Sequence, residues 1–371
     1  MKHIFSILVI SLTFVTCNTR EVDKVVNKNV SDKEATLSLE EYYSTLVKRM
    51  DKGIMLGHQD ALAYGSMWYG ERGRSDMKSV CGDYPAVVGW DLGKIEKGSA
   101  LNIDSVSFSS IKKYVSEVYQ VNGVSTFNWT IEPLSQDDEV TTNRIGSVLP
   151  GNTNHNQYIG YLDQLANFFL ELKNEKGEYI PVIFRPFSDA ESADSWWNIN
   201  DNSKEEYKAL WRMTVDYLRN KKKIHHVLYA YSLYSPDSDS DYSDIYPGDA
   251  YVDIIGVNLY LNLETDTDGS QYKKDLNRSL KAASEFAQKH NKIAALTDTG
   301  LKGIKLSNFF SSIVTPIISK YKISYILFGR NAWNIEDYYH IPIPGHPASE
   351  DFDVFASNPR ILTRTKLDVR S

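Results

Sequence analysis

Cysteine is scarce in this sequence, which has two among its 371 residues, so a disulfide-rich scaffold is excluded. A long basic run is also missing: 41 Lys and Arg stand against 48 Asp and Glu, a formal charge of -7. This balance of charge gives no sign of a basic surface that would bind nucleic acid or an anionic membrane. No group of His, Cys and carboxylates has metal-ligand spacing, and no Gly-rich phosphate loop follows an early strand. The sequence therefore predicts neither a cofactor nor a metal.

The long hydrophobic run at the start of the chain is too short to be a membrane-spanning helix. Lys2 precedes an apolar stretch over 4–15, and Cys17 follows it, which resembles a bacterial lipoprotein signal. Residues 1–17 are then a cleaved signal, and Cys17 carries a lipid that anchors the protein to the cell envelope or outer surface. Plain secretion, or a periplasmic location, is the alternative. Residues 18–36 are polar and are predicted to be a flexible tether.

Aromatic residues are plentiful, with 24 Tyr, 14 Phe and 7 Trp. Aromatic faces stack on sugar rings, although packing in the core accounts for most of them. We therefore expect a few of these side chains to be exposed in a binding cleft.

Strand and helix patterns alternate along residues 37–371, which indicates a parallel sheet with helices around it. The helical spacing is clear in the apolar residues of three segments, over 162–170, 207–218 and 280–286. An α/β fold of the (β/α)8 TIM-barrel class, as one domain with long loops at the carboxyl ends of the strands, is the prediction; an open doubly wound sheet is the alternative. The predicted strands cover 54–58, 86–91, 124–129, 179–186, 226–231, 252–258, 293–297 and 324–328.

Two acidic residues follow predicted strands where a barrel places its ligand site. Asp189 comes after the fourth strand and Asp298 after the seventh. One carboxylic acid that protonates a leaving oxygen, and one carboxylate that attacks or activates water, would suit glycoside hydrolysis. Taken singly, each Asp has a structural alternative as a helix cap.

Several segments together resemble glycoside hydrolase family 26, which contains many bacterial β-mannanases. The segments, in chain order, are Gly57-His58-Gln59, the stretch from Gly82 to Gly93 that includes Trp90-Asp91, Tyr246 to Asp249 with Tyr251 to Gly256, and Pro342 to Pro347. The resemblance covers about Tyr42 to Phe355. It implies a TIM barrel that hydrolyses β-mannan or a related β-glycan, with an endo-1,4-β-mannosidase type of action.

The positions that the resemblance assigns to the two catalytic glutamates hold Asp189 and Asp298. Other expected residues also differ: Thr130 and Ser188 stand where the family carries His, Asn258 where it carries Asp, and Gly329 where it carries Trp. Each exchange of Glu for Asp withdraws a carboxylate by one methylene, whereas a retaining pair lies about 5 to 5.5 Å apart and an inverting pair about 6.5 to 9.5 Å. Altered or weakened catalysis is therefore expected. Glu191 is an alternative acid.

Nine further residues are predicted to bind substrate. Arg185 should pair with carboxylates, and the family carries a Trp-rich loop at Trp196 and Trp197. The nine are His58, Trp90, Trp129, Arg185, Trp196, Trp197, Asn258, Tyr260 and Trp333. Three functions stay open: a β-mannan hydrolase with Asp189 as acid/base and Asp298 as nucleophile, an inactive cell-surface glycan-binding protein, and a hydrolase with changed specificity or inverting stereochemistry.

Overall fold

The computed structural model describes residues 29–134, 144–191 and 195–367. Its main sheet closes into a ring of eight parallel strands, since β10 pairs with β1. The strands in ring order are β1 (Ile54–Gln59), β4 (Val87–Asp91), β5 (Val124–Asn128), β6 (Val182–Arg185), β7 (Val227–Tyr234), β8 (Ile254–Leu261), β9 (Ile293–Leu301) and β10 (Tyr325–Phe328). The predicted TIM barrel is confirmed, and each of these strands overlaps a predicted one. The open sheet is excluded by the closure.

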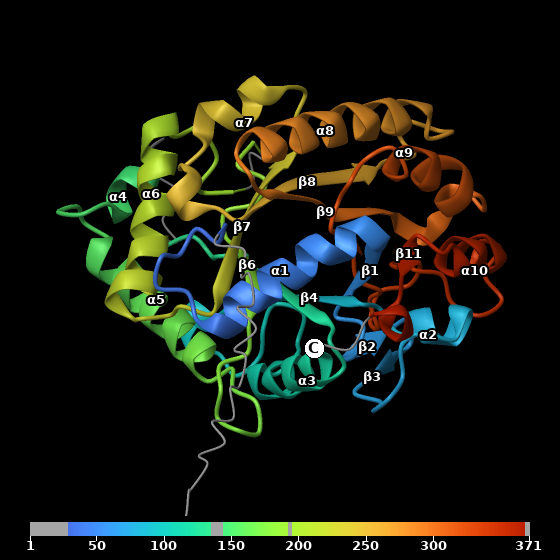
Figure 1. The fold of residues 1–371 in the computed structure, drawn as a ribbon, viewed down its shortest axis with the longest axis horizontal. Coiled ribbons are helices and arrows are strands. Elements are labelled where there is room, and N and C mark those ends of the chain that lie inside the picture. Colours follow the sequence, from blue (N-terminus) through green and yellow to red (C-terminus); the bar gives the residue numbers. More distant parts are fainter. Residues whose placement is uncertain (1–28, 135–143, 192–194, 368–371) are drawn as a thin grey trace, which may run out of the picture.

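Helices surround the ring in chain order, from α3 through α8 to α10, as the colours of Figure 1 show. The α-helices are α1 (Leu37–Lys52), α2 (Asp76–Cys81), α3 (Phe108–Gln120), α4 (Arg144–Val148), α5 (His155–Leu170), α6 (Lys204–Asp216), α7 (Asp239–Ile245), α8 (Ser270–Lys289), α9 (Thr315–Ile318) and α10 (Ser349–Ser357). Short 3-10 or π turns are η1 (Ile95–Lys97), η2 (Tyr217–Lys221), η3 (Asp249–Tyr251), η4 (Lys302–Ile304), η5 (Phe309–Val314) and η6 (Arg364–Lys366). In the described part of the chain, no helix is both long and apolar enough to cross a bilayer.

Helix α1 packs against the barrel at the amino ends of the strands (Figure 1). Its Leu39 and Leu46 are fully buried and belong to one apolar cluster with inward-facing strand residues such as Met55, Leu228 and Ala295. A larger cluster lies between the strands and the outer helices. The barrel interior is therefore filled from its amino end, and its carboxyl end is left for the site.

The segment before α1 is packed against the barrel, which corrects the predicted tether over 18–36 in its last part. The backbone N–H of Ser31 donates to Asp253 at 2.6 Å, and Asp32 forms ion pairs with Arg219 and His225 at 3.6 and 2.8 Å. Both residues are buried. Polar composition alone predicts a solvated segment, whereas these polar residues bond to other polar side chains. The predicted signal and Cys17 lie outside the described residues.

Two small additions to the barrel had no clear signal in the sequence. Strands β2 (Tyr64–Gly65) and β3 (Trp68–Tyr69) form an antiparallel hairpin in the loop after β1. Strand β11 (Ile361–Leu362) pairs with the start of β1. Runs of two residues are too short for periodicity to detect.

A bulge in β9 changes the direction of its side chains beside the site. The pairing of β8 with β9 runs from Val257 opposite Leu296 directly to Asn258 opposite Asp298, so Thr297 has no partner of its own. The pairing with β10 shifts at the same place. Strand side chains otherwise alternate between the two faces. The extra residue lets Thr297 and Asp298, which are consecutive, both face the barrel interior.

Candidate active site

A cavity of about 460 Å³ lies at the carboxyl ends of the strands. Its volume falls within the range of roughly 300 to 1,000 Å³ found for ligand pockets. Polar and charged side chains dominate its lining. The lining residues are Gln59, Asp91, Ile103, Asp104, Asn128, Arg185, Tyr260, Asp298, Gly329, Arg330, Tyr338 and His340.

Asp298 of β9 lines this cavity, with 29% of its side chain exposed. The Tyr260 hydroxyl donates a hydrogen bond to its Oδ1, and the Arg185 guanidinium lies 3.6 Å from its Oδ2. Burial raises the pKa of Asp298 to about 6, while Arg185 and Tyr260 oppose that rise. The carboxylate is thus ionised at neutral pH and held by two partners, as a nucleophile or base requires.

Asp189 lies in the turn after β6 and is not one of the lining residues. Its Oδ1 accepts a 2.7 Å hydrogen bond from Asn258 Nδ2. Burial raises its pKa, against the effects of Asn258 and Arg185, and its charge in turn raises the pKa of Asp298. Asp189 is therefore close enough to Asp298 to influence its ionisation, and burial raises the pKa of both carboxyl groups.

Arg185 connects the two carboxylates. Besides Asp298, its Nη1 donates to the Thr297 carbonyl at 2.7 Å and to Asn258 Oδ1 at 3.3 Å. Thr297 Oγ1 also donates to Asn258 Oδ1, at 2.7 Å. Asn258 is thereby fixed with its amide nitrogen toward Asp189. Arg185 thus pairs with a carboxylate, as expected, and Asn258 and Tyr260, which were predicted to bind substrate, bond to Asp189 and Asp298.

A second hydrogen-bond chain crosses the site through the residues that replace the expected His side chains. Ser188 Oγ donates to Asn128 Oδ1 at 2.8 Å, and Asn128 Nδ2 donates to Asp91 Oδ2 at 2.9 Å. Thr130 Oγ1 donates to the same Asp91 oxygen at 2.7 Å. Asp91 and Asn128 line the cavity, so Ser188 and Thr130 position groups that a ligand can reach.

Gly329 is required by the packing around Tyr260. A Cβ added at this position would lie 2.7 Å from the Tyr260 hydroxyl and 2.9 Å from His340 Nδ1. His340 is buried, its ring lies 5.3 Å from that of Tyr260, and its Nδ1 bonds to the Arg330 carbonyl at 2.9 Å. Burial lowers its pKa to about 4, so the imidazole is neutral. Tyr260 and His340 thus fill the space where the family resemblance implies a Trp.

Four of the tryptophans predicted to bind substrate are buried, so the prediction is wrong for them. Trp90 faces away from the barrel and stacks on Tyr114 of α3, with ring centroids 5.5 Å apart. Trp129 is only 1% exposed, and its Nε1 donates to Glu96. Trp196 and Trp197 are 2% and 6% exposed. None of the four presents a ring face to a sugar.

The last two residues predicted to bind substrate, His58 and Trp333, differ in their exposure. His58 is fully buried, and burial lowers its pKa to about 3, so it lies beneath the surface as a neutral group and does not line the cavity. Trp333 is 36% exposed in the loop after β10.

Several lining residues were missed by the sequence analysis. Gln59, Asp91 and Arg330 lie at or just after the ends of predicted strands. Their positions in the strand pattern could therefore have identified them as lining residues. Asp104 pairs with Arg330 at 3.0 Å, and burial raises its pKa to about 6. It lies well after β4, and His340 lies ten residues beyond Arg330, so neither had a local signal.

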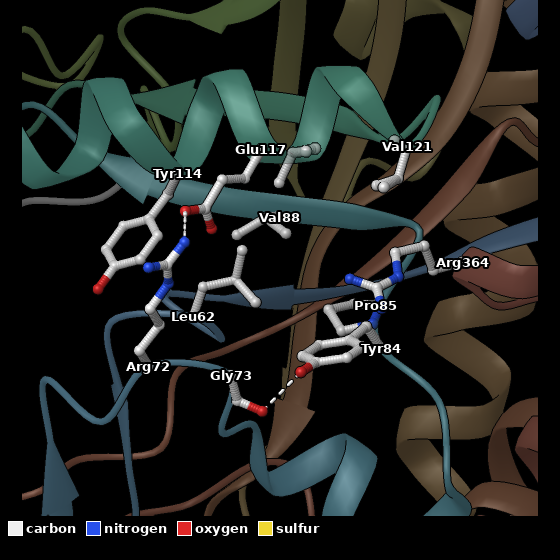
Figure 2. A pocket seen from close by; sticks show the side chains of 12 residues that line it. Leu62, Arg72, Gly73, Tyr84, Pro85, Val88, Tyr114, Glu117, Val121 and Arg364 are labelled. Carbon is white, nitrogen blue, oxygen red and sulfur yellow. Dashed lines mark hydrogen bonds and ion pairs between the residues drawn. The ribbon is translucent and has the colours of Figure 1, made fainter.

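A smaller cavity of about 80 Å³ lies between α3 and the segments around residues 62–85 (Figure 2). Its polar groups are already paired: Arg72 lies 4.0 Å from Glu117, and the Tyr84 hydroxyl donates to the Gly73 carbonyl at 2.5 Å. The Arg364 guanidinium covers the Tyr84 ring at 3.7 Å. At this size it is well below the roughly 300 Å³ of ligand pockets and separate from the carboxylates.

A third cavity, of about 510 Å³, opens at the opposite end of the barrel between α1 and α8. Its described lining includes three lysines, Lys292, Lys320 and Lys322, and no carboxylate. Of these three cavities, only the one at the carboxyl ends of the strands is lined by more than one described carboxylate. Among the described residues, no three His, Cys, Asp or Glu side chains are grouped so as to hold a metal ion.

Comparison with known proteins agrees with this geometry. Residues 26–299 match the model of glycosyl hydrolase family 26. A mannan endo-1,4-beta-mannosidase of Bifidobacterium adolescentis is 29% identical over 92% of this chain, which spans only 36% of that relative's length; one of Bacillus subtilis strain 168 is 24% identical over 90% of both chains. The solved structure of a β-mannanase of this family from Bacteroides ovatus is 38% identical, with a TM-score of 0.85, over 89% of this chain and 96% of its own. This chain belongs to glycoside hydrolase family 26.

Proposed function

We propose that this protein hydrolyses internal β-1,4 bonds of mannan, with Asp189 as acid/base and Asp298 as nucleophile. The observation that carries the proposal is the pair of carboxylates, one in the turn after β6 and one on β9, linked by Arg185 and Asn258 beside a polar cavity of about 460 Å³. The substrate is inferred from the relatives, which are named for hydrolysis of mannan.

In the first step, Asp298 attacks the anomeric carbon while Asp189 gives its proton to the leaving oxygen. Tyr260 and Arg185 hold the Asp298 carboxylate toward the cavity, and burial of Asp189 favours its protonated form. In the second step, Asp189 takes a proton from the water that hydrolyses the glycosyl ester. This sequence retains the anomeric configuration. A product released with inverted configuration would instead assign Asp298 the role of base.

The test is hydrolysis of a panel of β-mannans, galactomannans and other β-glycans by the purified domain. Asp298→Asn should abolish hydrolysis, since it removes the attacking charge. Glu264→Gln, which neutralises an exposed carboxylate in the loop before α8, is the matched control and should leave the rate unchanged. Binding of glycan without hydrolysis of any polymer by the wild-type protein would contradict the proposal and favour a glycan-binding protein.

Glu191 is the competing acid, and the same assay separates it from Asp189. Burial raises the pKa of Glu191 to about 7, and its Oε2 accepts a weak 3.4 Å hydrogen bond from the Tyr234 backbone N–H. We assign the acid role to Asp189 because Asp189, unlike Glu191, bonds to Asn258 and so to the Arg185 network. Asp189→Asn should therefore lower the rate far more than Glu191→Gln. The reverse order would transfer the role to Glu191.

We further propose that Cys17 anchors the protein to the cell envelope by a lipid. The support is the signal-like sequence over 1–17.

A further inference from the structure

A fully buried carboxyl group, that of Asp60, adjoins one wall of the active-site cavity without lining it. Asp60 directly follows β1. The Tyr64 hydroxyl donates to its Oδ2 at 2.7 Å, whereas its Oδ1 is buried and meets no hydrogen-bond donor among the described residues. An ionised carboxylate in this place would give up its bonds to water and regain few of them, which is costly.

The side chain that Asp60 meets is a second carboxyl. Asp104 lines the cavity, with 9% of its side chain exposed, and lies close enough to Asp60 for a hydrogen bond between the two side chains. Ionised carboxylates only accept hydrogen bonds, so two of them cannot bond to each other. A bond between Asp60 and Asp104 therefore requires a proton on one of them.

The charges around the two carboxyls also call for one proton. The Arg330 guanidinium lies 3.0 Å from Asp104, and its charge lowers the pKa of both carboxyls. The other charged groups that act on them, Asp91 and Lys94, are of opposite sign. One guanidinium balances one carboxylate, so ionisation of both would leave a negative charge without compensation in a buried place.

The directions of the pKa shifts agree with this count. Burial is the largest cause for both groups, and it raises the pKa of Asp104 to about 6 and that of Asp60 well above its usual range. The charge of Asp104 raises the pKa of Asp60 further. Two carboxyls that interact in this way lose their protons in two separate steps that belong to the pair.

We propose that Asp60 and Asp104 share one proton and that this acid pair positions Arg330 in the cavity wall. Asp60 carries the proton and donates it to Asp104, whose charge is left for Arg330. Asp60 does not line the cavity, so it is a positioning residue and not a catalytic one. Loss of the proton at higher pH would add one negative charge to the wall and leave two repelling carboxylates beside Arg330.

A retained proton makes the stability of the fold depend on pH. Asp in an unfolded chain has a pKa of about 3.9, so above about pH 6 the folded pair holds a proton that the unfolded chain has lost. The stabilisation is fully present at low pH and is lost as the pH rises through the folded pKa of the pair. Until the pair ionises, this proton alone should raise the equilibrium constant of unfolding about tenfold per pH unit.

The experiment compares denaturant unfolding of the wild type and of Asp60→Asn between about pH 6 and pH 8. The Asn amide donates to Asp104 without a titrating proton, so the ratio of the two unfolding constants should change about tenfold per pH unit. Asp104→Asn leaves one carboxyl for Arg330 and should have the same effect. Asp353→Asn, at an exposed position of α10, is the matched control and should leave the pH dependence unchanged.

A ratio for Asp60→Asn that does not vary with pH would overturn the proposal. So would an effect of Asp60→Asn that Asp104→Asn lacks, since Asp60 would then hold a proton of its own. If Asp60→Asn does not fold, Tyr64→Phe tests the same proton. The Tyr64 hydroxyl lowers the pKa of Asp60, so its removal should extend the steep range of the unfolding constant to higher pH. An unchanged range in Tyr64→Phe would count against a proton on Asp60.

Discussion

Asp189 has a left-handed backbone, with φ of 57°, and Phe187 two residues earlier has φ of 51°. Among residues other than Gly, Asp and Asn adopt this conformation at least cost, because their short polar side chains hydrogen-bond locally. The main chain at this turn therefore favours Asp over the longer Glu that the family resemblance implies. The shorter side chain is consistent with its backbone.

The ionisation of Asp298 should set the acid limb of activity. Burial raises its pKa to about 6, and the carboxylate must be charged to attack, so kcat/KM should fall about tenfold per unit as the pH drops below 6. The Tyr260 hydrogen bond stabilises the charged form and lowers this pKa. Tyr260→Phe should thus move the acid limb to higher pH. The pH profile of kcat/KM on a soluble substrate measures this, and a limb that stays in place or moves to lower pH would contradict it.

Gly329 offers a test of how tightly Tyr260 is placed. In Gly329→Ala the new methyl group would lie 2.7 Å from the hydroxyl of Tyr260, which holds Asp298, so Tyr260 must shift. We expect kcat to fall by about a hundredfold, the order of loss for a misplacement of about 1 Å. Gly160→Ala in α5, where an added Cβ meets nothing within 4 Å, is the control. An unaltered kcat in Gly329→Ala would show that Tyr260 tolerates displacement.

At the level of single residues, the sequence predicted which strand ends meet but not which side chain faces inward. The sequence predicts that Trp90 and Trp129 bind substrate, yet their neighbours Asp91 and Asn128 line the cavity. Alternation along a strand sends one residue of each pair inward and the other outward, and both phases are compatible with a buried apolar run. The large aromatic residue goes to the helix side, where there is room for it.

The bulge in β9 is an element-level feature that no periodic pattern reveals. Strict alternation would put Thr297 and Asp298 on opposite faces, whereas the unpaired residue places both toward the interior. Thr297 then bonds to Ser232 and Asn258 beneath the site, while Asp298 lines the cavity. The eight strands could be predicted because each is a distinct apolar run. The register between them could not, since it depends on contacts between strands distant in sequence.

Helix α1 should matter for stability and not for chemistry. Leu46→Ala removes a fully buried side chain from the cluster inside the barrel, so the free energy of unfolding should fall by about 2 to 5 kcal/mol. Leu37→Ala, at a 73% exposed position of the same helix, should change it by less than about 0.5 kcal/mol. Denaturant unfolding gives both values. A large loss of kcat in folded Leu46→Ala protein would mean that α1 also influences the site at the other end.

On the scale of the whole molecule, the amino-terminal segment and the cavity lie at opposite ends of the barrel. The Ser31 backbone N–H donates to Asp253, which directly precedes β8. The Thr36 backbone N–H donates to the carbonyl of His225, two residues before the start of β7. The cavity lies at the strands' carboxyl ends. A lipid on Cys17 would therefore hold the protein by one end and leave the cavity facing away from the membrane.

The anchor can be tested apart from the enzyme. Cys17→Ser should shift the exported protein from the membrane fraction to the soluble fraction, because it removes the thiol that carries the lipid. Hydrolysis of soluble mannan per molecule should stay the same, since Cys17 lies far along the chain from every lining residue. Equal partition of the wild type and the variant would argue for plain secretion.

The closed ring has a consequence for how such a protein can be modified. The spacing between β6 and β10 is fixed by the number and stagger of the strands, and loops have no part in it. The β2–β3 hairpin lies outside the Arg185 network, so it can be exchanged without re-aiming Asp189 or Asp298, whereas the loop after β10 carries His340, which packs on Tyr260. Grafting a different hairpin onto this rim would then change the surface beside the cavity while the bond-breaking groups keep their geometry.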